Sequence, residues 1–374
     1  MAKAISYSRI KKYQGGYACE LEDYWTYEQG RWPAQSSFLC NGSAFHEAIN
    51  MAMRHTAKHG ELPPFGRMLQ VYQDNFEREA SETEFKDDED PAEIMRTWGE
   101  ALEVWWGETA PLYRPHEADP RNVEIKFFLE LEGLPRALRG KIDLLGDRRE
   151  SAEIPWDHPS VKRGVLVDWK TGSKDPSAAD LHGDLQPTVY QMAFEIDPEI
   201  RARVEITKLV EIRYEHVINT GPGLTEQEYL DAVTEHETNK RKPIPWNVRP
   251  NEVSNWMKLY GPQGSKKDLK KKPNLPRRVR STVTTRTAAD IDWLGITLQR
   301  VNARMDAADL VRQHGGENAA RLLWVPPSPG HWMCNAEKCA HWAYCRGAVV
   351  DPPKAAPEPA TEEPPTSTEA PTDD

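Results

Sequence analysis

The chain has 374 residues, which is enough to bury a core as one large domain or as two ordinary ones. Its 38% hydrophobic and 29% charged residues are typical of a soluble globular protein. No run of about 18 apolar residues is present, and the opening MAKAISYSRIKKY lacks the apolar segment of a secretory signal. These features exclude a membrane-spanning class, and we expect a cytoplasmic protein.

The net charge of −11 is unlike the basic field of most nucleic-acid-binding proteins, but the charge is unevenly distributed. Acid is concentrated in Asp87–Asp90 and in the C-terminal tail, whereas nine Lys and Arg residues lie within Lys266–Arg286. That basic run is either a solvated loop or an arm that follows phosphates. The preceding Trp246, Trp256 and Tyr260 are either core residues or stacking faces for unpaired bases.

Residues 1–120 predict mainly helix. Within GSAFHEAINMAMRH the apolar residues recur with helical spacing and His46 lies at the edge of their stripe. That stripe consists of Phe45, Ala48, Ile49, Ala52 and Met53.

The middle of the chain predicts strands. The runs Val123–Leu131 and Ala137–Leu145 are joined by EGLPR, which is typical of a hairpin turn. Two more strands are predicted at Gly164–Lys170 and Ile206–Val217, with a helix that begins near Leu185 between them.

The remaining chain predicts an insertion, a helix and a tail. A helical stretch at Thr225–Asn239 precedes the basic run, and Thr287–Arg312 predicts a long helix. Residues 351–374 contain seven prolines, no aromatic residue and no bulky aliphatic residue, so we expect them to be disordered. We therefore divide the chain into a helical region 1–120, a core 121–217, an insertion 218–283, a helix and cysteine lobe 284–350 and the tail 351–374.

Three polar residues on two of the predicted strands could carry chemistry. In the run from Val165 to Lys170 alternate side chains share a face, so Asp168 and Lys170 point the same way. Asp143 stands between Ile142 and Leu144 on the preceding strand, on the face away from both. If the strands are neighbours, two carboxylates and one ammonium group converge.

Such a group of residues suits phosphodiester hydrolysis. Carboxylates are preferred ligands of Mg²⁺, which lowers the pKa of a bound water, and a lysine beside the metal stabilises developing negative charge. The alternative for Asp168 and Lys170 is an ordinary surface ion pair on an amphipathic strand.

The cysteines indicate a metal centre rather than disulfides. Five cysteines are too few for a disulfide framework, but Cys334, Cys339 and Cys345 crowd into twelve residues. A local zinc site would need a fourth ligand, which His331 or His341 could supply.

Several segments together resemble one known family. GKIDLL, VDWKTG and LQPTVYQMAF follow one another at the intervals seen in RecB-like nucleases of the PD-(D/E)XK type, which include CRISPR-associated adaptation exonucleases and phage exonucleases. SYSRIKKYQGGYACELEDYW resembles the family's N-terminal segment, GSAFHEA its histidine motif and PPSPGHWMC its cysteine cluster. The resemblance runs from Ser6 to Cys345 and implies an α/β protein. Its PD-(D/E)XK restriction-endonuclease-like core would be a mixed sheet flanked by helices, with a helical N-terminal region and a C-terminal cysteine lobe.

The resemblance also implies roles for individual residues. The metal ligands would be His46, Asp143, Asp168 and the backbone carbonyl of Trp169, and Lys170 would be the catalytic lysine. Gln186 and Tyr190 match the QxxxY motif, which positions DNA and the active site. Glu124 stands where many members carry an acidic residue.

The family's iron–sulfur centre is a 4Fe–4S cluster, here implied on Cys19, Cys334, Cys339 and Cys345. The first spacing is commonly two residues and here is four, so zinc stays open. No role is implied for Cys40, which we expect to be a buried thiol.

The resemblance implies a DNA exonuclease that uses Mg²⁺ or Mn²⁺. Its partners would be DNA, single-stranded or with free ends, and recombination or replication proteins, in the host cytoplasm if a phage encodes it. Two alternatives stay open: a non-catalytic DNA-binding or assembly protein of the same fold, and a zinc-bound interaction module.

Overall fold

The computed structural model describes residues 4–13, 19–172, 183–203, 209, 211–219, 278–321, 339 and 341–345. The chain divides into two compact units. The sheet unit comprises Met1–Tyr7 and Ala34–Leu298, and the cysteine unit comprises Ser8–Pro33 and Gln299–Asp374.

A mixed sheet organises the sheet unit. Within the described residues it has seven strands in the order β1-β6-β7-β8-β9, with β4 and β5 also paired to β6. The β6–β7 and β8–β9 pairs are antiparallel, whereas β7–β8 is parallel. The strands are β1 (Ala4–Ser6), β4 (Tyr113–Pro115), β5 (Val123–Leu129), β6 (Ala137–Arg148), β7 (Lys162–Gly172), β8 (Glu211–Ile218) and β9 (Arg278–Thr284). The predicted α/β class with a mixed sheet flanked by helices is confirmed.

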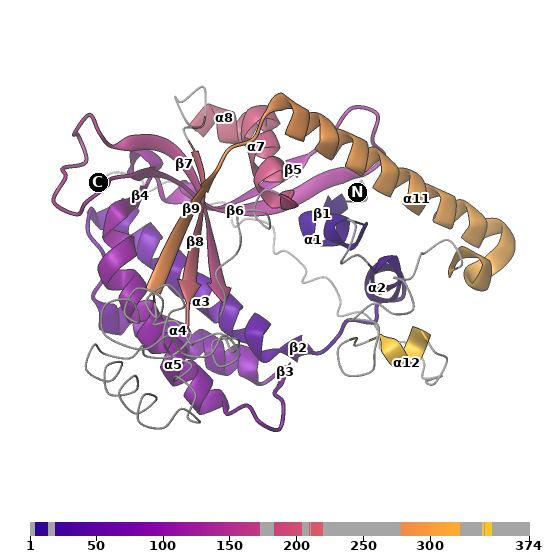
Figure 1. Ribbon diagram of the computed structural model, residues 1–374, viewed down its shortest axis with the longest axis horizontal. Coiled ribbons are helices and arrows are strands. Elements are labelled where there is room, and N and C mark those ends of the chain that lie inside the picture. The colour runs from indigo at the N-terminus through magenta and orange to yellow at the C-terminus, as the bar shows by residue number, and fades with distance from the viewer. Residues whose placement is uncertain are drawn as a thin grey trace, which may run out of the picture. The chain divides into compact units, whose positions relative to one another are not determined.

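Helices flank this sheet. Figure 1 shows α3, α4 and α5 together beside strands β7, β8 and β9. The longest of them, α3, begins where the Ser36 hydroxyl accepts a hydrogen bond from the Leu39 amide and ends at Gly60, whose φ of 75° is left-handed. The helices are α3 (Ser37–His59), α4 (Phe65–Ala80), α5 (Pro91–Val104), α7 (Gln186–Ile196) and α8 (Pro198–Arg203), and a short parallel pair, β2 (Gln35–Ser36) and β3 (Thr83–Glu84), lies beside α3.

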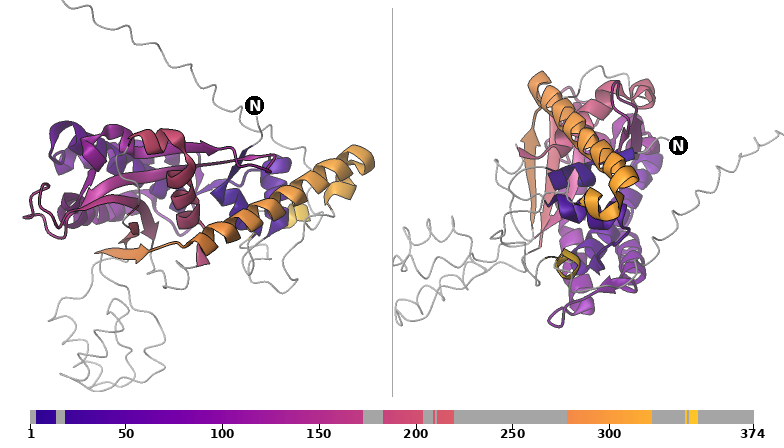
Figure 2. Two further views of the ribbon diagram at one scale, coloured as in Figure 1. Left: turned by 90° about the horizontal axis from the view of Figure 1, so that it is seen from above. Right: turned by 90° about the vertical axis from the view of Figure 1, so that its right-hand side faces the viewer.

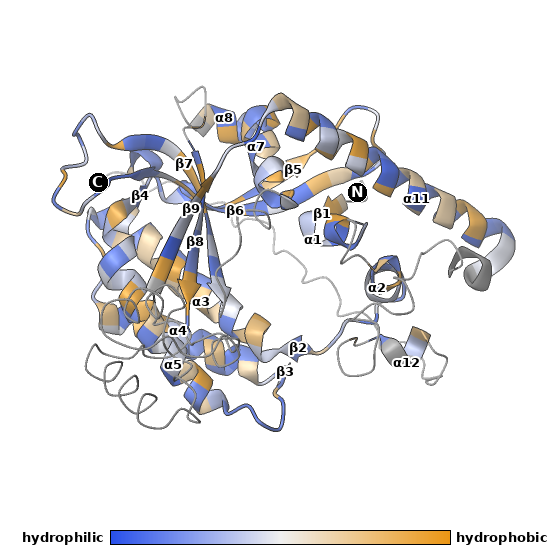
Figure 3. Cartoon of the chain, in the orientation of Figure 1, coloured by the Kyte–Doolittle hydropathy of each residue, from blue (hydrophilic) through white to orange (hydrophobic). Residues whose placement is uncertain are grey.

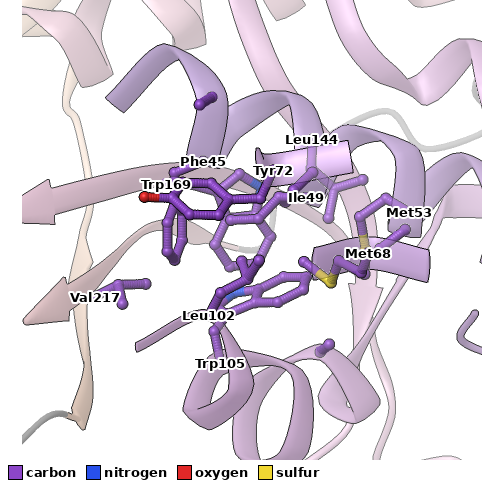
Figure 4. Packing of buried hydrophobic residues seen from close by; sticks show 14 of the residues in the cluster. Phe45, Ile49, Met53, Met68, Tyr72, Leu102, Trp105, Leu144, Trp169 and Val217 are labelled. Atoms are coloured by element: carbon purple, nitrogen blue, oxygen red, sulfur yellow. The ribbon is translucent and has the colours of Figure 1, made fainter. Parts of the chain in front are cut away.

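The main core lies between α3, α4, α5 and one face of the sheet. The predicted apolar stripe of α3 is buried there, as Figure 4 shows for Phe45, Ile49 and Met53. The predicted core face of β7 is confirmed as well, because Val167 and Trp169 belong to the same cluster. Asp168 and Lys170 therefore lie on the opposite face of the sheet from α3's apolar stripe.

The predicted strands agree with the structure where it describes them. The hairpin is confirmed, since β5 and β6 pair antiparallel from Leu129–Leu138 to Val123–Leu144. The expected helix Thr225–Asn239, Cys334, the tail and residues 220–277 of the insertion, including its tryptophans and lysines, lie outside the described residues.

The end of the basic run differs from the prediction. We expected an irregular loop or arm up to Arg286, but Arg278–Thr284 form strand β9, which pairs with β8. Arg286 is 8% exposed and donates hydrogen bonds to Thr188 Oγ1 and to the Asp184 carbonyl. The prediction of an irregular loop is therefore wrong for these residues, and Arg286 is a structural cation.

The predicted long helix is confirmed as α11 (Ala288–Arg321), which both views of Figure 2 show as an extended run. Its geometry departs from helical at Gly316, where φ is 77°. Apolar and polar residues are interleaved along it in Figure 3, and its buried residues recur every three or four positions. Those residues are Leu294, Leu298, Val301, Met305 and Ala308. Among the described helices, none is both long enough and apolar enough to cross a membrane.

The cysteine unit joins the early chain to the later part of α11. Its helices are α1 (Tyr7–Ile10, which begins at the last residue of the sheet unit), α2 (Glu20–Asp23) and α12 (Trp342–Cys345). Buried Asp23 pairs with Arg9 at 2.8 Å, and Arg304 of α11 pairs with Glu20 at 2.7 Å. Residues distant in sequence are therefore packed together within this unit.

Candidate active site

The polar residues of the site gather where β6 and β7 part. Pairing between the two strands ends at Leu144–Val167. Beyond it, the amide of Trp169 donates a 2.9 Å hydrogen bond to Asp143 Oδ2 instead of to a backbone carbonyl of β6. The carboxylate thus replaces the next rung of the sheet and is fixed close to the Asp168–Lys170 segment.

Asp168 is 2% exposed and has contacts on both oxygens. Its Oδ1 accepts hydrogen bonds from the Tyr190 hydroxyl at 2.9 Å and from the side-chain amide of Gln186 at 3.0 Å. Its Oδ2 lies 2.7 Å from Lys170 Nζ but accepts no hydrogen bond of good geometry within the described residues. Oδ2 therefore retains unused capacity as an acceptor or ligand.

The side chain of Gln186 bridges Lys170 and Asp168. Its Oε1 accepts a 2.9 Å hydrogen bond from Lys170 Nζ, while its Nε2 contacts Asp168 Oδ1 and the Tyr190 hydroxyl, the latter at 2.5 Å. Gln186 and Tyr190 are one helical turn apart on α7, as their spacing predicted. The structure therefore brings Asp143, Asp168, Lys170, Gln186 and Tyr190 together.

Burial and neighbouring charge perturb these groups. Burial raises the pKa of Asp168 to about 6, with a further rise from Asp143 and an opposing effect from Lys170. Burial acts against the charge of Lys170, but Asp168 and Asp143 outweigh it and raise the pKa of the ammonium group. Burial, and next the Asp168 charge, raise the pKa of Tyr190, which remains a neutral donor.

Two further predicted residues, His46 and Glu124, differ in the partners that they contact. His46 of α3 is 28% exposed at its side chain, and its Nδ1 stands 3.5 Å from Asp143 Oδ2. Glu124 is instead bound by Arg54, at 2.7 Å, and by Lys141, and its φ of 56° is left-handed. His46 can contribute to the same centre, whereas two cations already neutralise Glu124.

The donor set fits a hard divalent cation in kind. Two carboxylates and an imidazole lie near one another, and Asp168 Oδ2 has acceptor capacity. As arranged, however, no group of three or more His, Cys, Asp or Glu side chains in the described part of the chain stands close enough together to hold a metal ion. Lys170 lies against the Asp168 oxygen that a cation would use, so the ammonium group has to shift for a cation to bind.

Three residues that support the site were not predicted. Asp184 Oδ1 accepts hydrogen bonds from the backbone amide of Gln186 at 2.9 Å and from the Tyr7 hydroxyl. Arg286 donates a hydrogen bond to the Asp184 carbonyl at 2.8 Å. An aspartate two residues before a helix is a recognisable capping signal, so Asp184 was detectable from the sequence. Tyr7 and Arg286 gave no such signal, because their partners lie 177 and 102 positions away.

Tyr214 also borders the site without having been predicted. It is the β8 neighbour of Asp168 in the parallel pair and is 1% exposed. Its hydroxyl has no hydrogen-bond partner within the described residues, and its ring centre lies 5.7 Å from Lys170 Nζ. A buried hydroxyl without a partner is unfavourable, so water or substrate is its natural acceptor or donor.

Cys19, Cys339 and Cys345 belong to the cysteine unit. Burial raises the pKa of Cys19 to about 11, and the thiols of Cys339 and Cys345 add to the rise. Trp25 Nε1 donates to Cys345 Sγ at 3.1 Å. His341 Nε2 lies 3.1 Å from Thr26 Oγ1. Cys40 is buried in the sheet unit's core, as expected.

Comparison with known proteins identifies the family. A family model described as the PD-(D/E)XK nuclease superfamily matches residues 4–346. A search of curated proteins gave no significant match. The match spans both units and every described residue of the site, and the chain belongs to the PD-(D/E)XK nuclease superfamily.

Proposed function

We propose that this chain is a RecB-like DNA exonuclease that hydrolyses phosphodiester bonds with Mg²⁺ or Mn²⁺. The observation that carries the proposal is the bridge that Gln186 makes between Lys170 and Asp168, beside Asp143. An ion pair that served stability alone would need no such bridge to a helix. A non-catalytic member of the superfamily would not need Asp143, Asp168 and Lys170 together.

In this proposal Asp143, Asp168, His46 and the Trp169 carbonyl hold the metal. When bound, the cation neutralises phosphate charge and lowers the pKa of a water. Lys170 directs its ammonium group at the attacking water and at the charge that develops on the phosphate. Gln186 fixes the direction of that ammonium group, and Tyr190 fixes Asp168.

A digestion series tests the activity and its mode. End-labelled linear DNA and covalently closed circular DNA, each single- and double-stranded, are incubated with Mg²⁺, with Mn²⁺ or with EDTA. An exonuclease degrades linear DNA with either metal and leaves circles intact. Cleavage of circles would make the enzyme an endonuclease, and no hydrolysis of any substrate would refute a nuclease function.

We further propose that Cys19, Cys334, Cys339 and Cys345 hold a 4Fe–4S cluster. Cys19 is a partly buried thiol within the electrostatic influence of Cys339 and Cys345, and such a set of sulfur donors suits iron. Zinc is the alternative and would recruit a histidine. His341 is a candidate for that ligand, because its Nε2 is paired with Thr26 while its Nδ1 is buried without a hydrogen-bond partner among the described residues.

A further inference from the structure

Tyr7, near the start of the chain, contacts the segment that precedes α7, the helix that carries Gln186 and Tyr190. It directly follows β1, whose residues Ala4–Ser6 pair with Ala137–Arg139 of β6. Ile5 is 1% exposed, so the segment that carries Tyr7 is anchored in the sheet. The Tyr7 hydroxyl donates to Asp184 Oδ1, 177 positions away.

Asp184 connects Tyr7 to Gln186. The same oxygen, Oδ1, accepts the Gln186 backbone amide at 2.9 Å, which is one of the amides that an α-helix leaves without an internal partner. From the other side, Arg286 binds the Asp184 carbonyl and the Thr188 hydroxyl. The first turn of α7 is thereby tied to the residue after β1 and to Arg286, two residues beyond the end of β9.

The side chain of Gln186 makes that turn important for chemistry. It contacts both Lys170 and Asp168 at 2.9 and 3.0 Å. A displacement of the turn by about 1 Å would break these contacts, and errors of that size can lower a rate by about 100-fold.

We infer that Tyr7, acting through Asp184, is a positioning residue of the nuclease site. Its hydroxyl fixes the start of α7 so that Gln186 holds Lys170 in its working direction. Burial, and next the negative charge of Asp184, raise the pKa of Tyr7, so the hydroxyl stays a proton donor. This inference rests on the proposed nuclease function, in which Lys170 and Asp168 act on the scissile phosphate.

The kinetic test removes the hydroxyl alone. Tyr7→Phe should lower kcat about tenfold, as loss of one hydrogen bond to a charged group allows, and leave KM within about twofold. Asp184→Ala should match or exceed this loss. Asp184→Asn should recover most of the rate, because an amide oxygen can still accept from Tyr7 and from Gln186.

Tyr72→Phe is the matched control. The Tyr72 hydroxyl also makes a buried hydrogen bond in the sheet unit, to Asn41 at 2.7 Å, but on α4 and away from α7. It should reduce stability to a similar degree without lowering kcat. Equal kcat losses in both variants would reduce the effect of Tyr7 to general destabilisation and overturn the inference.

Hydrogen exchange gives a readout that does not need activity. In Tyr7→Phe the peptide that covers residues 184–190 should exchange faster, and in Tyr72→Phe it should not. Unchanged exchange, an unchanged kcat, or an Asp184→Asn variant as slow as Asp184→Ala would each overturn the inference. A wild type that hydrolyses no DNA would refute the proposed function, and the exchange result would still decide whether Tyr7 anchors α7.

Discussion

The Asp168 carboxyl group is difficult to ionise in the folded protein, since burial raises its pKa to about 6 even with Lys170 beside it. Its folded pKa lies above the ordinary 3.8, so the ionised form destabilises the metal-free fold. That penalty applies fully above about pH 6 and disappears as the pH falls toward 4. Residues that function demands are often destabilising in this way.

The first prediction concerns stability. Asp168→Asn should raise the free energy of unfolding at pH 8 by roughly 1 to 3 kcal/mol, because the neutral amide avoids the cost of a buried charge. Urea unfolding in EDTA measures it, with exposed Asp74→Asn as the control. The gain should vanish near pH 4, where Asp168 is protonated. A loss of stability at pH 8 would contradict this account of Asp168.

The second prediction concerns the pH dependence of cleavage. A protonated Asp168 is a poor metal ligand, so activity at limiting metal concentration should fall as the pH drops through about 6. Higher metal concentrations should move the midpoint to lower pH, because metal and proton compete for one carboxylate. Initial rates across a buffer series at two Mn²⁺ concentrations measure the shift, and a midpoint independent of metal would exclude this competition.

At the scale of elements, the backbone of β6 at Gly146 lies close to the Arg114 carbonyl of β4. A Cβ there would lie 2.7 Å from the Arg114 carbonyl oxygen, next to the register shift between Gly146 and Asp147. That shift lets buried Asp147 bind His116 Nδ1 at 2.6 Å and Arg114 at 3.1 Å. A glycine at 146 therefore leaves room for the Arg114 carbonyl beside β6, the strand that carries Asp143.

The third prediction follows from that contact. Gly146→Ala should destabilise the protein by about 1 to 3 kcal/mol, because the clash is with backbone. Gly295→Ala in α11 meets nothing within 4 Å and should be neutral or stabilise by up to about 1 kcal/mol. Chemical unfolding of the two variants compares them directly. Equal effects would show that the backbone at Gly146 can yield.

Strands and helices with a buried face could be predicted from the sequence, because burial imposes a regular period. The apolar stripe of α3 and the alternation in β7 are examples. Strand β9 was missed because Arg278–Thr284 lies inside the basic run, which we interpreted as a loop or an arm. Four of its seven residues are β-branched and favour a strand, and pairing with β8 completes it.

The site divides along the same line. Strand alternation predicted that Asp168 and Lys170 share a face near Asp143. The resemblance, rather than local spacing, added Gln186 and Tyr190 to the same site. Tyr7 and Arg286 could not be predicted, because only the folded sheet brings them to Asp184. The ion pairs of Glu124 with Arg54 and Lys141 were equally hidden from the sequence.

At the scale of the whole molecule, the cysteine unit joins residues that are far apart in the chain. Trp25 packs with Tyr344 at a ring distance of 5.7 Å and bonds to Cys345, so residues about 320 positions apart meet. Among the residues that the structure describes, the buried members of this contact are Tyr24, Trp25 and Ala308. A metal link between these segments would add to the stability of such a contact.

The fourth prediction is that the proposed 4Fe–4S cluster links these distant segments of the cysteine unit. Protein purified without oxygen should be brown, and replacing Cys19, Cys334, Cys339 or Cys345 by serine should remove iron and lower the unfolding temperature. Cys40→Ser is the control and should retain iron, because Cys40 lies in the core of the sheet unit. Stoichiometric zinc without iron in anaerobic protein would replace the cluster by a zinc site.

The most direct test of the central claim is single-turnover cleavage of end-labelled DNA by the wild type, Asp168→Asn and Lys170→Met, with DNA binding measured in parallel. We predict that both variants bind DNA with nearly the wild-type dissociation constant and cleave it at least about 1,000-fold more slowly in saturating Mg²⁺. Substantial Mg²⁺-dependent cleavage by purified Asp168→Asn would contradict the assignment of catalysis to this site.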